Sequence, residues 1–176
     1  MPETLSTETI YNGHIFDVKA DTIRENSTEY RREVVVHNGS AVIVPVFEDD
    51  TVALVRQYRH AAGKYLLELP AGSLDDGEDP ATGAARELLE EVGVTAARLE
   101  KLIEFYVSPG FLTEKMFVFL ATGLTEVGQQ LESDEFIDLV RVTFPEALAL
   151  IRSGEIEEAK TIIGLIFAGS RSGHVL

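Results

Sequence analysis

The sequence contains no cysteine and no tryptophan, and it has only 2 methionines in 176 residues. Without cysteine it forms neither disulfides nor thiolate zinc sites, which fits a cytoplasmic protein. No apolar run approaches ~18 residues, so we expect no membrane span. The acidic N-terminal residues also lack the apolar core of a signal peptide. Positive charge is scarce, since 15 Lys and Arg face 30 Asp and Glu and the net charge is −15. This balance argues against a nucleic-acid-binding surface.

One segment carries a dense pattern of Gly, Arg and Glu. Residues 72–94 read GSLDDGEDPATGAARELLEEVGV. This fits G-x5-E-x7-R-E-U-x-E-E-x-G-U, where U is aliphatic, and every specified position is filled. At ~6% per fixed position, a chance match anywhere in this chain has odds of about one in ten million. The fixed positions are Gly72, Glu78, Arg86, Glu87, Glu90, Glu91 and Gly93.

The second half of this pattern predicts an amphipathic helix. Asp79 is suited to cap the helix, Pro80 to its first turn and Gly93 to its end. Steps of three and four residues predict one apolar stripe, made of Ala81, Ala84, Ala85, Leu88 and Val92. Three carboxylates fall within an arc of ~100° on the other side, where they repel one another: those of Glu87, Glu90 and Glu91.

A hard divalent cation would remove this repulsion. Oxygen ligands on a rigid helix suit Mg²⁺ or Mn²⁺, whereas the four scattered histidines argue against zinc. The alternative is a solvated acidic helix face without a metal, but the matched Gly, Arg and Glu spacing disfavours it. Arg86 and Glu78 are expected to be structural, pairing with box carboxylates and fixing the loop before the helix.

The pattern resembles the Nudix box, the metal-binding motif of hydrolases that cut nucleoside diphosphates linked to another moiety. The resemblance implies an α/β fold, the Nudix α/β/α sandwich with a mixed sheet. The lead-in from Glu68 to Gly72 resembles the E-x-P-A-G string of ADP-ribose pyrophosphatases. In that subgroup the carbonyl before the first box glycine is a metal ligand, and here it belongs to Ala71. The metal ligands implied are Ala71, Glu87, Glu90 and Glu91.

Three further strings resemble the same subgroup and imply substrate-binding residues. Residues 108–115 are close to S-P-G-x-x-x-E-K, residues 55–59 match V-R-Q-Y-R, and residues 31–33 match R-R-E of an N-terminal sheet. The second Arg of the V-R-Q-Y-R string would face the phosphates, and an R-R-E arginine would reach them within one chain or across a dimer interface. The plainer alternatives are a Pro-Gly turn and a solvated arginine pair. The candidates are Arg31, Arg32, Arg59, Ser108, Pro109, Gly110 and Glu114.

Hydrolysis also needs a group that activates water. In the ADP-ribose subgroup this is a Glu in a loop after the box, in a string similar to D-E-x-I-E-V, and Glu135 aligns with it. Asp134 and Glu132 are rivals if the alignment is shifted. Glu90 or Glu91 of the box is a further alternative, orienting water between two metals.

Secondary structure and domains follow from the remaining patterns. Apolar and alternating runs predict strands over residues 14–24, 30–37, 41–47, 51–58, 66–71, 99–107, 115–121 and 136–144. Helices are expected over residues 145–153 and roughly 160–168. We expect residues 1–40 to form an N-terminal strand region with a small antiparallel sheet, and residues 41–176 to form the catalytic domain. The resemblance implies a homodimer paired through the N-terminal sheet.

The resemblance implies Mg²⁺-dependent hydrolysis of a nucleoside diphosphate sugar, with ADP-ribose giving AMP and ribose 5-phosphate. GDP-mannose is the alternative substrate. NADH pyrophosphatase is disfavoured because its S-Q-P-W-P-F-P-x-S tail is absent. A catalytically dead, nucleotide-sensing domain is disfavoured because no box glutamate is lost. Candidates for stacking on the base are Tyr11, Phe16, Tyr30 and Phe111.

Overall fold

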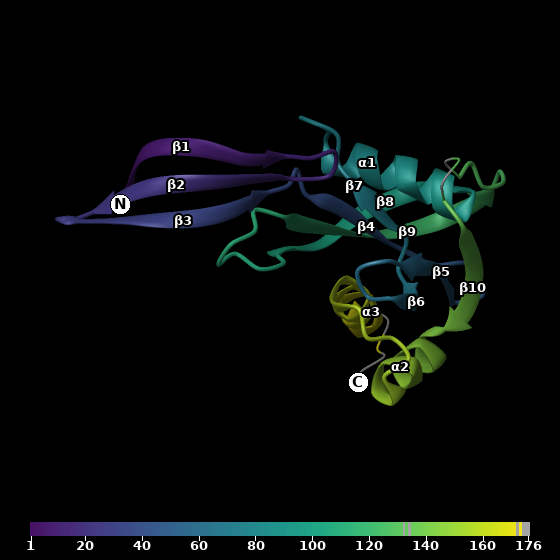
Figure 1. The fold of residues 1–176 in the computed structure, drawn as a ribbon. Coiled ribbons are helices and arrows are strands. Elements are labelled where there is room, and N and C mark those ends of the chain that lie inside the picture. Colours follow the sequence, from purple (N-terminus) through teal and green to yellow (C-terminus); the bar gives the residue numbers. More distant parts are fainter. Residues whose placement is uncertain (132, 134, 172, 174–176) are drawn as a thin grey trace. The chain divides into compact units, whose positions relative to one another are not determined.

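A computed structural model describes residues 1–131, 133, 135–171 and 173. The chain divides into two compact units (Figure 1). Unit 1 comprises residues 1–39 and 105–116, and unit 2 comprises residues 40–104 and 117–176. No helix within the described residues is long and apolar enough to cross a membrane.

Unit 1 is built on an antiparallel sheet in the order β1-β2-β3, with β1 (Glu3–Asn12), β2 (Asp17–Glu25) and β3 (Thr28–Val36). The turn between β2 and β3 uses Asn26 with a φ of 55°, a left-handed conformation that Asn tolerates. The segment 105–116 joins this unit through the far end of β3. There the Val35 N–H donates to the Phe111 carbonyl at 2.7 Å, and the Thr113 N–H donates to the Val35 carbonyl at 2.9 Å.

Strand β1 was not expected from the sequence. Its residues, ETLSTETIYN, are exposed along the whole strand apart from the partly buried Leu5. A strand that buries neither face shows no alternation of apolar and polar residues, so periodicity does not reveal it. Its pairing with β2 is a tertiary fact, joining Glu3 to Arg24 at one end and Asn12 to Asp17 at the other.

Unit 2 holds two sheets, with strand orders β7-β4-β9-β8 and β10-β5-β6. The strands are β4 (Ser40–Pro45), β5 (Thr51–Arg59), β6 (Lys64–Glu68), β7 (Ala71–Ser73), β8 (Val94–Tyr106), β9 (Lys115–Glu126) and β10 (Ile137–Thr143). The helices are α1 (Pro80–Glu87) with its extension η1 (Leu88–Val92), α2 (Phe144–Ser153) and α3 (Ala159–Arg171). Every residue of β4 is buried, and β4 contacts both α1 and α3 (Figure 1). The expected α/β class with a small antiparallel N-terminal sheet is confirmed.

A second difference from the expected elements lies before the box. The single strand expected over residues 66–71 is replaced by the two short strands β6 and β7, because the chain leaves one sheet after Glu68 and enters the other at Ala71. Pro70 lies at this crossing and has no N–H for a ladder, while its carbonyl accepts the Ile43 N–H at 2.9 Å. The crossing places Glu68 beside β5 and Ala71 beside β4.

Candidate active site

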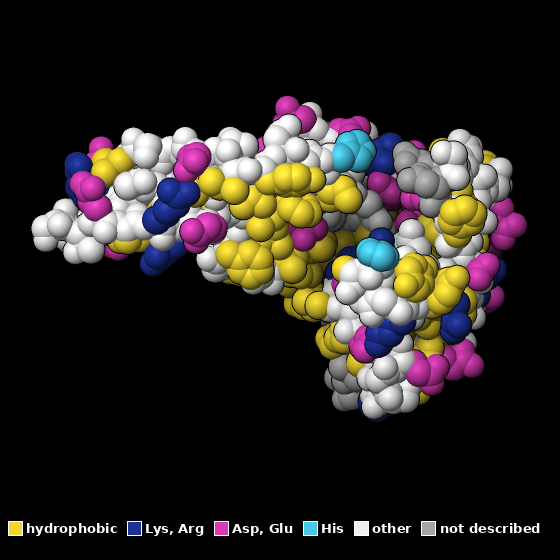
Figure 2. All heavy atoms as spheres, viewed as in Figure 1, with side chains coloured by type: hydrophobic (Ala, Val, Ile, Leu, Met, Phe, Trp, Pro, Cys, Tyr) yellow, Lys and Arg dark blue, Asp and Glu magenta, His cyan; other side chains and the backbone are white. Residues whose placement is uncertain are grey.

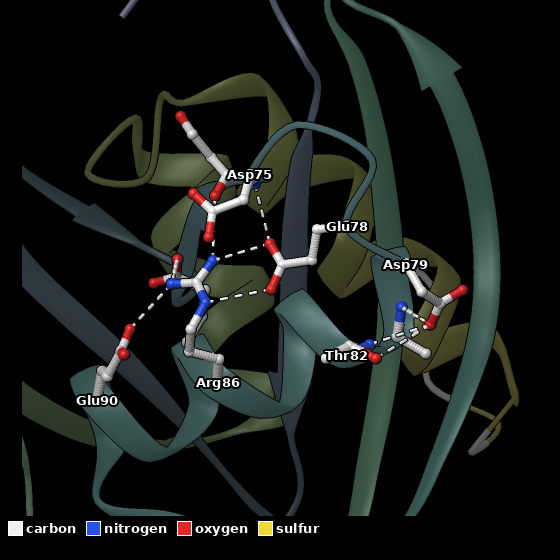
Figure 3. Close-up of polar contacts among 9 residues, drawn as sticks. Asp75, Glu78, Asp79, Thr82, Arg86 and Glu90 are labelled. Atoms are coloured by element: carbon white, nitrogen blue, oxygen red, sulfur yellow. Dashed lines mark hydrogen bonds and ion pairs between the residues drawn. The ribbon is translucent and has the colours of Figure 1, made fainter. Parts of the chain in front are cut away.

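The box helix begins and ends where its sequence signals predicted. The Asp79 carboxylate accepts the N–H groups of Ala81 and Thr82, both at 3.1 Å, and Pro80 occupies the first turn (Figure 3). After Glu87 the helix widens into the π-helical turn η1. It ends at Gly93, whose φ of 75° is left-handed and where an added Cβ would lie 2.4 Å from the Gln129 backbone nitrogen. Only glycine meets both demands.

The helix buries two of its three box carboxylates. Glu87 is 6% exposed and Glu91 is 2% exposed. Burial raises the pKa of Glu87 to about 7 and that of Glu91 to about 8, and the neighbouring carboxylates add to both shifts. The expected apolar stripe is correct at Ala84, Leu88 and Val92 but wrong at Ala85, which is exposed. Glu87 and Glu91, on the carboxylate side of the helix, are buried instead because that side packs against β7.

Strand β7 lies directly against the carboxylates of Glu87 and Glu91. The Ala71 N–H donates to Glu91 Oε2 at 2.9 Å, which lowers the pKa of Glu91 but does not outweigh burial. At Gly72 an added Cβ would lie 1.9 Å from Glu87 Oε1. The first box glycine is therefore required so that the Glu87 carboxylate can lie directly on the backbone.

Arg86 pairs with three box carboxylates, those of Glu78, Glu87 and Glu90 (Figure 3). Its Nη1 lies 2.7 Å from Glu87 Oε1 and 3.0 Å from Glu90 Oε2, and its Nη2 donates to Glu78 Oε2 at 3.2 Å. Glu78 also accepts the Asp75 N–H at 3.0 Å, which ties the loop before the helix. Hydrogen bonding to Glu78 raises the pKa of Arg86, and the same bond lowers the pKa of Glu78.

Arg59, at the end of β5, lies in a second charged cluster. Its Nε and Nη2 donate to Glu68 Oε1 and Oε2, both at 2.8 Å. Lys160 of α3 donates to the same Glu68 Oε2 at 2.5 Å. The carboxylate of Glu91 adds to the raised pKa of Arg59, after the hydrogen bond to Glu68, so this cluster lies within electrostatic reach of the box helix.

Two residues that precede Glu135 in the chain form hydrogen bonds to η1. Gln129 Nε2 donates to the Glu91 carbonyl at 2.6 Å, and the Gln130 N–H donates to the Glu90 carbonyl at 3.0 Å. Glu135 is partly buried, and its charge raises the pKa values of both Glu87 and Glu91. The structure therefore brings Glu135 close to the buried carboxylates. The rivals Glu132 and Asp134 lie outside the described residues.

The donor set at the box helix suits a hard divalent cation. All candidate ligands are oxygens, and burial raises the pKa values of Glu87 and Glu91 although Arg86 pairs with Glu87, so a bound cation would stabilise the ionised form of both carboxylates. Within the described part of the chain, no three acidic or histidine side chains converge as a ready metal cage. Arg86 accounts for this at Glu87 and Glu90, since both carboxylates are paired with its guanidinium.

The other predicted substrate residues belong to unit 1. Arg31 pairs with Glu8 at 2.9 Å, and the guanidinium of Arg32 lies 4.4 Å from the centre of the Tyr30 ring. The Ser108 carbonyl accepts the N–H groups of Phe111 and Leu112, which closes the Pro-Gly turn. Glu114 Oε1 lies 3.8 Å from His37 Nδ1. The substrate contacts of Arg31, Arg32, Ser108, Pro109, Gly110 and Glu114 stay predictions.

Sequence reasoning missed the roles of Glu68 and Lys160. Glu68 was visible only as a letter of the E-x-P-A-G string, and Lys160 as the first residue of a helix. One signal was present, because Lys160 is in phase with the buried face of α3, which includes Thr161, Gly164, Leu165 and Ala168. A lysine on such a face needs a buried partner.

Comparison with known proteins agrees with this geometry. The family description "NUDIX domain" matches residues 37–163, and the chain belongs to this family of hydrolases. It is similar to the ADP-ribose pyrophosphatases of Bacillus subtilis (38% identical, over 90% of this chain and 88% of the relative) and Mycobacterium tuberculosis (41%, 93% and 81%). A GDP-mannose pyrophosphatase of Yersinia pestis is 35% identical over 88% of this chain and 82% of its own. The crystal structure of an ADP compounds hydrolase superposes with a TM-score of 0.86 at 27% identity, covering 99% of this chain and 97% of the other.

Proposed function

We propose that this protein hydrolyses the diphosphate bond of a nucleoside diphosphate sugar, with ADP-ribose as the substrate and AMP and ribose 5-phosphate as products. One observation carries the proposal: the buried carboxylates Glu87 and Glu91 lie on β7, both within electrostatic reach of Glu135, and Glu91 is also within electrostatic reach of Arg59. The similarity to two ADP-ribose pyrophosphatases supports this substrate. The absence of cysteine supports a cytoplasmic location.

Glu87, Glu90, Glu91 and the Ala71 carbonyl are the groups that would hold Mg²⁺, or Mn²⁺ in its place. When bound, the cation would neutralise diphosphate oxygens and make a water molecule more acidic. Contacts within the protein already position three of these carboxylates. Arg86 holds Glu87 and Glu90 in place, and the Ala71 N–H orients the Glu91 carboxylate.

Two residues outside the box complete the proposed chemistry. Glu135 accepts a proton from the attacking water or orients it, because a carboxylate beside buried acids is suited to a general base. Arg59 binds a phosphate oxygen and stabilises the charge that develops as one phosphorus is attacked and the other phosphate leaves. Glu90 or Glu91 is the alternative base.

GDP-mannose is the second candidate substrate. The similarity to a GDP-mannose pyrophosphatase supports it, because that relative covers nearly as much of this chain as the ADP-ribose pyrophosphatases do. The proposed chemistry at the diphosphate is the same for both substrates. The choice between them lies with residues that contact the base and the sugar.

The test is a substrate panel with identified products. ADP-ribose, GDP-mannose, NADH and diadenosine polyphosphates are each incubated with the purified protein and Mg²⁺, and with Mg²⁺ replaced by excess chelator. We expect AMP and ribose 5-phosphate from ADP-ribose, and no turnover in chelator. Turnover of GDP-mannose alone would replace the proposed substrate by the alternative. Full turnover in chelator, or none on any compound, would contradict the proposed function.

We also propose that the active protein is a homodimer paired through unit 1. Apolar side chains gather over part of this unit (Figure 2). Seven large apolar residues of unit 1 are between 42% and 69% exposed: Ile10, Tyr11, Ile15, Phe16, Tyr106, Val107 and Phe111. A second copy would cover them, and would let an arginine such as Arg31 or Arg32 reach the substrate of the other chain.

A further inference from the structure

The N-terminal end of α3 is fastened to the residue that follows Glu68. Thr161 Oγ1 accepts the buried Leu69 N–H at 2.8 Å. Gly164, one turn further, lets the helix approach closely, since an added Cβ there would lie 2.5 Å from Leu69 Cδ1. These two contacts fix the start of α3 against the chain segment that carries Glu68. Lys160 is therefore held at a set distance from the Glu68 carboxylate.

Lys160 and Glu68 are both buried, at 8% and 1% exposed. Lys160 Nζ lies 2.5 Å from Glu68 Oε2 and 3.3 Å from Glu158 Oε2. Glu158 is chiefly engaged elsewhere, because it accepts the N–H groups of Lys160 and Thr161 at 3.1 and 3.0 Å and caps the helix. Glu68 is thus the principal partner of the Lys160 ammonium. Stability alone does not account for such a pair, since apolar replacements of buried ion pairs are often at least as stable.

Arg59 approaches the same carboxylate from the other side. Its Nε and Nη2 occupy the two Glu68 oxygens in a side-on pair, which leaves the Nη1 edge of the guanidinium outside the pair. The Arg59 side chain is 39% exposed, whereas that of Glu68 is 1% exposed. The cluster is therefore buried at Glu68 and Lys160 and opens to solvent only at Arg59.

We propose that Lys160 is a positioning residue for Arg59, acting through Glu68, and this rests on the proposed function in which Arg59 binds a substrate phosphate. A carboxylate with one cationic partner accepts an arginine side-on or end-on. Lys160 occupies Oε2 and so fixes the plane of the Glu68 carboxylate. The guanidinium is then held in the side-on arrangement with one edge presented to the phosphate, before substrate arrives. The C-terminal helix thereby becomes part of the support of the active site.

The first measurement compares Lys160→Met with Lys64→Met. Lys64 lies opposite Arg59 in the β5–β6 ladder and pairs with Glu157, so its substitution removes the same charge nearby without touching Glu68. Well below both melting temperatures, we expect Lys160→Met to lower kcat/KM for ADP-ribose about tenfold and Lys64→Met to change it less than about twofold. Equal values for Lys160→Met and the wild type would overturn the proposal.

A double-mutant cycle separates positioning from a general loss of structure. Arg59→Lys keeps a cation beside Glu68 but has no fork to orient, so in that background Lys160→Met is expected to cost less than about twofold. If Lys160→Met costs as much in the Arg59→Lys background as in the wild type, Lys160 does not act through Arg59. That additive result would overturn the proposal.

A third readout does not depend on the substrate. Proton exchange at Arg59 Nε is followed by nuclear magnetic resonance, with the signal assigned by its loss in Arg59→Lys. We expect Lys160→Met to speed this exchange about tenfold, and Lys64→Met to leave it unchanged, because only the first loosens the side-on pair. Unchanged exchange in Lys160→Met would overturn the positioning role even if ADP-ribose is turned over. Faster exchange in a protein that hydrolyses no nucleotide sugar would instead support the positioning role and refute the proposed function.

Discussion

Single residues at this site are constrained by contacts that extend only a few ångströms. Glu87 lies on Gly72 so closely that any side chain at that position would displace the Glu87 carboxylate, and Glu91 accepts the Ala71 N–H. These two carboxylates lie against backbone atoms of β7, whereas Glu135 lies in a loop outside the box helix. The backbone contacts hold the first pair in a fixed place, and the role of Glu135 as the general base stays a proposal.

Glu135→Gln tests the general base. We expect kcat to fall roughly 10²- to 10⁴-fold, the range for loss of such a base, because an amide does not accept the proton of the attacking water. KM and melting temperature should change little, since loop substitutions away from the core cost little stability. Steady-state kinetics and calorimetry provide the measurements.

The matched control for this variant is Glu132→Gln, which is expected to be nearly silent. Retained activity in Glu135→Gln, together with a loss in Asp134→Asn or Glu90→Gln, would show that the base is a neighbouring carboxylate or belongs to the box.

Glu87→Gln and Glu91→Gln test the carboxylates expected to hold the metal. Each is expected to lower the chemical step by orders of magnitude. Their melting temperatures without metal should be unchanged or higher at neutral pH, because an uncharged amide removes a buried, repelled charge. Glu104→Gln is the control for the Glu-to-Gln change itself, because Glu104 is an exposed residue of β8. Near-normal turnover in both variants would mean that the metal is bound elsewhere.

At the scale of elements, the helix α1 with its extension η1 carries an electrostatic cost that depends on pH. The folded pKa values of Glu87 and Glu91, about 7 and about 8, lie above the ordinary value of 4.5. Between about pH 4.5 and about pH 8 the folded state therefore binds more protons than the unfolded state. The free energy of unfolding must therefore decrease as pH rises from about 4.5 to about 8, by at most about 1.4 kcal/mol per pH unit for each proton.

The metal-free protein is accordingly expected to melt at a lower temperature at pH 8 than at pH 5.5. Saturating Mg²⁺ should diminish this difference, because a cation stabilises the ionised carboxylates. Differential scanning calorimetry in chelator and in Mg²⁺ measures both curves. The variant carrying both Glu87→Gln and Glu91→Gln should lose most of the dependence. A wild-type melting temperature that is constant from pH 5.5 to pH 8 in chelator would contradict the assigned burial.

At the scale of the whole molecule, the prediction concerns assembly. We expect a homodimer in sedimentation velocity at micromolar concentration. We expect Ile15→Glu combined with Phe16→Glu to give a monomer, because the added carboxylates would lie unpaired in the apolar contact between the two copies. Val127→Glu is the control, since Val127 is also exposed, at 56%, but lies in unit 2. A wild-type monomer with full activity would contradict the dimer.

Local sequence signals were sufficient where the interactions are local. The start and end of the box helix follow from Asp79, Pro80 and Gly93, whose effects act within a few residues. The helix α2 is another case, since its expected bounds of 145–153 agree with the observed Phe144–Ser153, where the structure shows a reciprocal cap of Thr143 and Glu146 at the start and Gly154 at the end. The oxygen donors of the box helix were also readable, because they depend on residue types and on helical spacing, whereas the metal that they would hold stays a prediction.

Other features depend on residues that are distant in the sequence, and only the tertiary structure decided them. Strand β1 has no periodicity of its own and is defined by its pairing with β2. Glu87 and Glu91 are buried because β7 lies against the helix, which no pattern within residues 72–94 requires. Arg59, Glu68 and Lys160 meet because a strand crossing at Pro70 and the close packing of Gly164 bring three separate segments together. Spacing along the chain determined which oxygen donors share the box helix, whereas packing between segments determined which of these carboxylates are buried and which arginine pairs with Glu68.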